Sequence, residues 1–150
     1  GELKNSRKLA KVIVDKRSEK KIETVKELTD TLMAFLPKNA EHKFLAKVFQ
    51  ALRIEVNREM EFLKDMLLQT AEVLKPGGRL VVITYHSLED RLVKNFIKNG
   101  LFKGEAEKDI YGHVDVPFEA VNRKIIVPSE EEIKENNRAR SAKLRIAKKL

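Results

Sequence analysis

The sequence contains no cysteine and no tryptophan, and it has only 6 glycines, 4 prolines and 2 tyrosines. Without cysteine, the chain has no disulfide framework, no thiolate zinc site and no cysteine nucleophile. No uninterrupted apolar run approaches the roughly 18–20 residues that a membrane-spanning helix needs. These absences exclude a disulfide-stapled domain and a transmembrane helix within these residues, and a reducing cytoplasm is the expected location.

What remains is the composition of a folded, charge-rich domain. The 150 residues are 42% hydrophobic and 36% charged, which favours a globular chain over a disordered one. This length is that of one domain with a sizeable core. The chain begins at Gly1 with Gly-Glu-Leu-Lys rather than methionine, so we expect it to be part of a longer protein.

The net charge of +8 is concentrated at the two ends of the sequence. Residues 1–21 carry eight basic side chains against three acidic ones, and residues 134–150 carry seven against one. Such a pattern favours a surface that faces a polyanion, because Lys and Arg contacts to phosphate release condensed counterions. The alternative is a set of solvated helix faces that keep the protein in solution. A membrane surface is disfavoured, since no basic stretch is paired with an apolar face carrying tryptophan.

The first half of the sequence has helical periodicity. A helix is predicted over residues 3–17, and Thr24 with Glu27 forms a capping box for a second helix that Pro37 stops. Apolar residues then recur every three or four positions from 49 to 74, which predicts one long helix. A Lys-Pro-Gly-Gly turn follows it.

The second half alternates strands and helices. Residues 79–85 are β-branched and apolar at consecutive positions, which is typical of a strand buried on both faces in a parallel sheet. Ser87 with Asp90 forms a capping pair that predicts a helix ending near Gly100, and residues 100–118 are predicted to be a loop.

Two further strands and one helix are predicted after this loop. The strands are 121–127 and 141–147, and the helix between them opens at Pro128-Ser129 with Glu132 as the capping partner. The order predicts an α/β domain with only three strands. A strand of the buried type needs a neighbour on each side, which these residues do not supply.

The most promising site follows the strand at 79–85. Tyr85, His86 and Ser87 stand at its carboxyl end, where ligands bind in open α/β sheets. We take these three residues as candidates for a supporting catalytic role. The alternative is that the segment only caps the next helix. A Ser–His nucleophilic pair is disfavoured, because adjacent side chains diverge and no nucleophile elbow surrounds them.

Two polar groups are candidates for RNA contact. Arg53 and Asn57 share a helical stripe with Gln50, and could hold a phosphate or a base edge. The alternative is a solvated face on which Arg53 pairs with a nearby acid. Arg138 and Arg140 are good donors to an RNA backbone, and their alternative role is to stabilise a helix C-terminus.

The sequence contains no motif for a metal or a nucleotide cofactor. The three histidines, His42, His86 and His113, are scattered without metal-ligand spacing. There is no G-x-G-x-x-G and no P-loop. The residues alone therefore indicate no more than a basic α/β domain, with RNA as a candidate partner.

Four segments, in this order, closely resemble one family, the bacterial ribosomal RNA small subunit methyltransferase H family, also called MraW. They are 49–57 (Phe-Gln-Ala-Leu-Arg-Ile-Glu-Val-Asn), 75–80 (Lys-Pro-Gly-Gly-Arg-Leu), 85–91 (Tyr-His-Ser-Leu-Glu-Asp-Arg) and 137–147 (Asn-Arg-Ala-Arg-Ser-Ala-Lys-Leu-Arg-Ile-Ala). The likeness runs essentially from end to end.

The resemblance implies an S-adenosylmethionine-dependent enzyme that methylates the N4 amine of a cytidine in the decoding region of 16S rRNA. It implies that this chain is the C-terminal portion of a Rossmann-like class I methyltransferase, with about three strands in a mixed sheet. Residues 1–47 would be the end of an inserted helical domain for substrate recognition, and residues 48–150 the methyltransferase part. The partner would be the small ribosomal subunit.

The chain departs from the family pattern in two places. The Gly-rich loop that binds the methyl donor, and the acidic residue for its ribose, are absent from these residues and are expected upstream of Gly1. We therefore expect no cofactor-binding residue in this piece and no activity from it alone. The family's His-Pro-Ala-Thr-Arg stretch is replaced by 42–48, His-Lys-Phe-Leu-Ala-Lys-Val. The open edge of the strand at 79–85 could also pair with a second copy to form a homodimer.

Two rival interpretations remain. One is a non-catalytic RNA- or ribosome-binding module with the same basic ends. The other is a helical interaction protein whose basic surface only keeps it in solution. Salt-dependent RNA binding would separate these two rivals.

Overall fold

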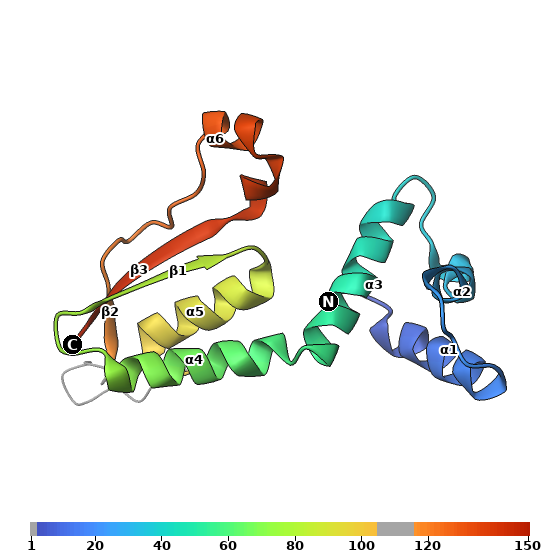
Figure 1. Ribbon diagram of the computed structural model, residues 1–150, viewed down its shortest axis with the longest axis horizontal. Coiled ribbons are helices and arrows are strands. Elements are labelled where there is room, and N and C mark those ends of the chain that lie inside the picture. Colours follow the sequence, from blue (N-terminus) through green and yellow to red (C-terminus); the bar gives the residue numbers. More distant parts are fainter. Residues whose placement is uncertain (1–2, 105–115) are drawn as a thin grey trace. The chain divides into compact units, whose positions relative to one another are not determined.

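A computed structural model describes residues 3–104 and 116–150 of the chain (Figure 1). It divides into two compact units, a first unit of residues 1–59 and a second unit of residues 60–150. The domain boundary expected after residue 47 falls inside a helix of the first unit. Every helix within the described ranges is too short or too polar to cross a lipid bilayer.

The expected position of the donor-binding residues, upstream of Gly1, is not tested by this structure. Gly1 itself lies outside the described residues, which begin at Leu3. The placement of the methyl-donor loop before Gly1 therefore stays a prediction.

The first unit is helical. It contains α1 (Ser6–Glu19), α2 (Val25–Thr31), a 3-10 turn η1 (Met33–Phe35) and α3 (Glu41–Val56). Leu9, Leu32 and Val48 form its buried core, one residue from each of the three α-helical regions or their ends. The two helices predicted near the N-terminus are confirmed, and Thr24 accepts a hydrogen bond from the Glu27 N–H at 3.1 Å, as the capping box predicts.

The prediction of one helix over 49–74 is wrong. The helix α3 ends at Val56, and α4 (Glu59–Val73) begins after a break at Asn57 and Arg58. Arg58 has a φ of 51°, which is the left-handed region and stops a right-handed helix. The apolar spacing continues across the break, so the periodic pattern alone could not reveal it.

The second unit contains a three-stranded sheet in the order β1-β3-β2. The strands are β1 (Arg79–Thr84), β2 (Phe118–Ala120) and β3 (Lys143–Lys149). The last strand lies in the middle and pairs antiparallel with both neighbours, with Val82 opposite Arg145 in the first ladder. Three strands are therefore confirmed, but the mixed sheet is wrong for the described residues, because each ladder is antiparallel.

A helix connects the two outer strands, which run in the same direction. The chain passes from β1 through α5 (Ser87–Asn99) to β2, and β3 inserts between them (Figure 1). This is a split βαβ unit, in which an antiparallel strand lies between the two parallel strands. The helix stop predicted at Gly100 is confirmed, since this residue caps α5 with a φ of 66°.

The strand predicted at 121–127 is wrong, because β2 occupies 118–120 instead. Beyond Val121, whose N–H bonds the Ile146 carbonyl, the polar run Asn-Arg-Lys leaves the ladder, and only an isolated bridge joins Ile126 to Leu144. Ser129 caps α6 (Glu130–Glu135) as predicted, accepting from the Glu132 N–H at 3.2 Å. Most of the loop predicted at 100–118, residues 105–115, lies outside the described residues.

The core of the second unit lies on one face of the sheet. The helices α4 and α5 pack there against β1, β2 and β3, and the best-buried side chains are Leu67, Val93, Phe96, Phe118 and Ala147. On the opposite face, Val81 and Ile83 are each 56% exposed. The prediction that this strand is buried on both faces is therefore wrong for the described residues, in which helices cover only one face.

Candidate functional site

The candidate site stands where β1 passes into α5. Thr84, the last residue of the strand, is buried and its hydroxyl donates to the Lys143 carbonyl at 3.4 Å. Tyr85 follows with 57% of its surface exposed. His86 and Ser87 then begin the helix, so the three candidate residues do lie at the carboxyl end of the strand, as the sequence predicts.

The helix α5 is capped by His86 with Glu89, not by the predicted Ser87 with Asp90. The His86 Nδ1 accepts the Glu89 N–H at 3.3 Å, and the Glu89 carboxylate accepts the Tyr85 N–H at 2.9 Å and the His86 N–H at 3.3 Å. The Nδ1 atom is separated from the backbone by the same number of bonds as the Asn side-chain oxygen. Histidine can therefore fill the position that Ser, Thr, Asp or Asn usually fills.

This capping bond fixes the tautomer of His86. Because Nδ1 accepts a hydrogen bond, the proton of the neutral ring belongs on Nε2. The Nε2 atom lies 3.1 Å from the Glu89 Oε1. This Nε2 atom is buried and makes no hydrogen bond with the described residues. Both ring nitrogens of His86 therefore face Glu89, one toward its backbone N–H and the other toward its carboxylate.

Asp90 holds a charged cluster that sequence reasoning missed. Its two carboxylate oxygens accept from the Arg145 guanidinium at 2.7 and 3.1 Å, and the Lys143 Nζ lies 3.5 Å away. Burial raises the pKa of Asp90, but the hydrogen bonds and charges of Arg145 and Lys143 lower it by more, so the net shift is downward. A signal was present, because Arg145 is a charged residue at an inward position of β3.

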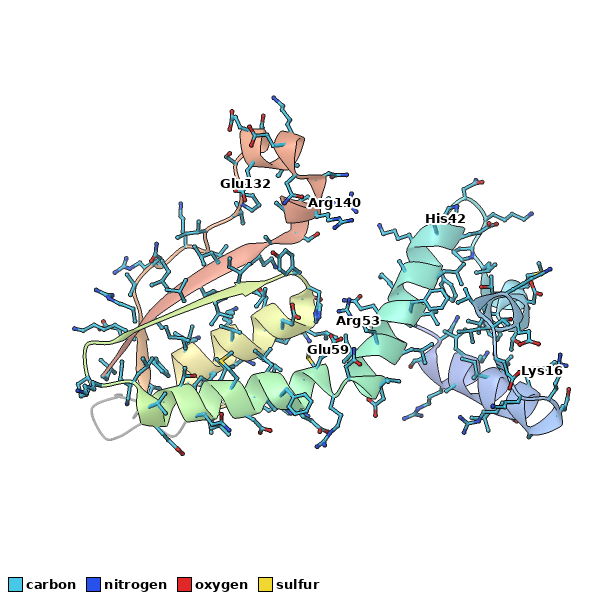
Figure 2. All side chains as sticks on the ribbon, in the orientation of Figure 1. Lys16, His42, Arg53, Glu59, Glu132 and Arg140 are labelled. Atoms are coloured by element: carbon cyan, nitrogen blue, oxygen red, sulfur yellow. The ribbon has the colours of Figure 1, made fainter. Side chains whose placement is uncertain are left out.

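Arg53 and Asn57 meet on one carboxylate. The Arg53 Nε and Nη2 donate to Glu59 at 2.8 and 3.1 Å (Figure 2). The Asn57 Nδ2 donates to the same carboxylate at 3.2 Å. The stripe predicted from their spacing is real, and it carries the acid partner foreseen as the alternative interpretation. RNA contact by these residues stays a prediction.

Arg138 and Arg140 lie on a 3-10 turn, η2 (Asn137–Ser141), that leads into β3. Figure 2 places Arg140 on this turn. Its Nη1 donates to the Asn137 side chain at 3.5 Å, and neither guanidinium pairs with a carboxylate in the part of the chain described. The buried Ala139 between them anchors the turn and leaves both arginines exposed.

Comparison with known proteins identifies the family of this chain. The sequence model of the MraW methylase family matches residues 1–150. The chain belongs to the MraW methylase family. Curated relatives of this family agree over the same residues.

Each relative below is named ribosomal RNA small subunit methyltransferase H. The chain is 62% identical to the one from Parabacteroides distasonis over its whole length, 61% identical to one from Bacteroides fragilis and 60% identical to the one from Christiangramia forsetii over 99% of its length. It spans about half the length of these relatives, covering 49% of each. The prediction that this is the C-terminal half stays a prediction.

Proposed function

We propose that this chain is part of an S-adenosylmethionine-dependent enzyme that methylates the N4 amine of a cytidine in the decoding region of 16S rRNA, in the cytoplasm. One observation carries the proposal. Identity near 60% extends over the whole chain, including the 85–91 segment, to relatives whose name states rRNA methylation.

The reaction needs positioning more than a strong base. The lone pair of cytosine N4 is delocalised into the ring, so the amine must be held in line with the methyl donor and its proton relayed. The donor, when bound, supplies the activated methyl group. The chain's own residues would orient the base and complete its hydrogen bonds.

The geometry divides the roles of the three candidates. Tyr85 is exposed beside the helix start, and its ring and hydroxyl can stack on or bond to a base. His86 is a positioning residue, because its ring holds the cap that fixes the strand-to-helix turn. Ser87 opens the helix at the same edge with an exposed side chain, and it is a candidate for contact with the base or with the loop that binds it.

Four residues are proposed to contact the RNA backbone: Arg53, Asn57, Arg138 and Arg140. The last two are the stronger candidates, because their guanidinium groups have no carboxylate partner among the described residues. Arg53 would have to share or release its bidentate pair with Glu59. On this proposal, substituting Arg140 lowers RNA affinity more than substituting Arg53.

We also propose that the β1-α5-β2 unit belongs to a Rossmann-like methyltransferase sheet, with residues 1–47 in a helical insertion. Two features support this. The outer edge of β1 has no partner in the described residues, and the face carrying Val81 and Ile83 is uncovered. A neighbouring strand and its helix, within the other half of the relatives' length, would satisfy both. A second copy pairing on the same edge is the competing occupant.

The test is donor binding and methyl transfer in two proteins. Calorimetry with S-adenosylmethionine should detect binding to a protein extended to the relatives' full length, and none to the 150 residues alone. Radiolabelled donor and small ribosomal subunits should give the same division for transfer. Methyl transfer by the 150 residues alone would overturn the proposed incompleteness. RNA binding without donor binding in the extended protein would favour the non-catalytic RNA-binding module.

A further inference from the structure

The second unit contains a cavity away from the candidate site. Its volume is about 660 Å³, and it is bounded by the second half of α5, by β2 and β3, and by residues 122–125. Its α5 residues, Lys94 and Lys98, stand seven and eleven positions beyond Ser87. At about 1.5 Å per residue, they lie roughly 10–17 Å along the helix from the turn at His86.

Four cations of this cavity are available to a ligand. They are Lys94 and Lys98 on α5, with Arg123 and Lys124 on the segment after β2. None of them makes an ion pair with any residue in the ranges 3–104 and 116–150. By contrast, Lys143 and Arg145 of the same unit are occupied by Asp90.

The lining has little negative charge to balance these four groups. Glu119 carries the one side-chain carboxylate of the lining among the described residues, and it lies opposite Lys148 in the β2–β3 ladder. Cations gathered without counter-charge repel one another, and a bound anion removes that repulsion. The arrangement is therefore that of an anion site.

Apart from Asn122 and Arg145, which is paired with Asp90, the rest of the lining is apolar. Ile97, Phe118, Leu144 and Ile146 line the cavity, and Phe118 is completely buried. A volume of about 660 Å³ is within the range of roughly 300–1,000 Å³ typical of small-molecule sites. A flat apolar group carrying phosphate matches both features, and a nucleotide is such a group.

We propose that this cavity takes one nucleotide of a single-stranded segment of the substrate RNA. Its phosphate contacts Lys94, Lys98, Arg123 and Lys124, and its base rests on the apolar lining. A concave site for one unit suits a single strand, whose bases can turn outward, better than a duplex. This inference rests on the proposed rRNA substrate, and it adds a second RNA contact beyond the candidate site.

The experiment uses the 150-residue chain and a fluorescent eight-nucleotide uridine oligomer, with affinity measured between 50 and 200 mM salt. Each phosphate contact on a single strand adds about 0.7 to the slope of log K against log salt. The site binds one phosphate, so the double variant K94Q/K98Q should lower that slope by up to about 0.7. Its affinity should therefore change up to about 2.6-fold less than the wild type's over this salt range.

Two controls isolate the cavity. K75Q/R79Q removes the same charge from exposed positions outside the cavity, and it should leave the slope nearly unchanged. K94R/K98R keeps the charge and should bind like the wild type. The amide spectrum of each variant verifies its fold, and K124Q, on the irregular segment, provides an independent variant if the helix substitutions unfold the unit.

The outcomes separate this inference from the proposed function. Equal losses in K94Q/K98Q and K75Q/R79Q would show a net-charge effect and overturn the cavity site, while leaving RNA binding in place. Uridine monophosphate could shift the NMR signals of Lys94 and Lys98 without being displaced by the oligomer. The cavity would then take a free nucleotide, and the proposed RNA ligand would be overturned. An abasic oligomer that binds as tightly as the uridine oligomer would overturn base binding. Loss of methyl transfer in the extended protein, with cavity binding intact, would count against the proposed function alone.

Discussion

Each of the two units of this chain is stabilised internally, and the stabilising interactions span different sequence distances in the two. In the first unit the ion pairs are local, such as Lys16 with Glu19 and Arg53 with Glu59. In the second unit Asp90 pairs with Arg145, 55 positions away, and the β1–β3 ladder joins residues 59 to 69 positions apart. Its buried cluster is also larger, with seven residues against three.

This difference indicates where each unit's order comes from. Helix starts, caps and i,i+3 pairs can form as soon as the local chain exists, so the first unit depends mainly on nearby residues. The second unit depends on contacts that exist only when three separated segments have met. Substitutions in its core or its charged cluster should therefore have the larger effects.

The largest effect is expected from Phe96→Ala. The side chain is 1% exposed and its ring stacks on Phe102 at 5.1 Å, so its removal leaves a cavity in the core of the second unit. We expect the free energy of unfolding of this unit to fall by about 3–5 kcal/mol. Hydrogen exchange of the α5 and β1 amides measures the loss.

The matched substitution in the first unit is Leu32→Ala, at a residue that is 0% exposed. We expect the free energy of unfolding of the first unit to fall by about 2–5 kcal/mol, measured by hydrogen exchange of the α1 and α3 amides. Because the core around Leu32 has only two other buried residues, the loss should lie at the lower end of this range. A loss larger than that of Phe96→Ala would reverse the comparison.

The next effect concerns the long-range ion pair, through Asp90→Asn. This change keeps the shape but removes the charge that Arg145 and Lys143 face, and we expect a cost of about 1.5–3 kcal/mol at neutral pH. The folded pKa of Asp90 lies below its usual value of 3.8, so the stabilisation is complete above that value and is lost as pH falls through the lower folded pKa. Denaturation of both proteins from pH 7 to pH 2 measures the difference, which should shrink with acid.

Each unit contains one capping box, Thr24 with Glu27 in the first unit and His86 with Glu89 in the second. Thr24→Ala and His86→Ala should each cost about 1 kcal/mol. His86→Asn should restore most of the second loss, because the Asn oxygen can accept the Glu89 N–H in place of Nδ1. Thermal unfolding measures all three. Failure of the asparagine to rescue would mean that the ring contributes by packing rather than by capping.

The smallest effect is the acid response of the first capping box. Hydrogen bonds from the Glu23 N–H, the Lys20 ammonium and the Thr24 N–H lower the pKa of Glu27 to about 2. The cap is therefore intact above the usual value of 4.5, and it weakens only as pH falls through about 2. A carboxyl titration by NMR, with Glu27 of the urea-unfolded chain as the reference, tests this value. A folded Glu27 curve that coincides with the unfolded one would contradict it.

Local signals in the sequence predicted the local features. The Thr24 and Ser129 caps, the glycine stop at residue 100 and the place of the candidate site at the end of β1 followed from short patterns. The break at Arg58 was missed because a left-handed residue leaves no mark in apolar spacing. The histidine cap was missed because histidine is an uncommon residue at that position.

Long-range features were not accessible in the same way. The strand at 121–127 had suitable residues, but the register that β3 imposes placed the ladder at 118–120. The partner of Asp90 could not be identified from its own neighbourhood, since Arg145 lies in another strand. The cluster of cavity cations could not be predicted from the sequence, because Lys94 and Lys98 are far in sequence from Arg123 and Lys124.

The central position of β3 has a consequence for biosynthesis. Both outer strands leave the ribosome before the strand that pairs with them, and the 59 positions between Thr84 and Lys143 take roughly 3–12 s to translate at about 5–20 residues per second. During that interval the backbone groups on the β1 edge that later pairs with β3 have no strand partner among the described residues. The three-stranded sheet can therefore form only after its central strand β3, which ends at Lys149, has been synthesised.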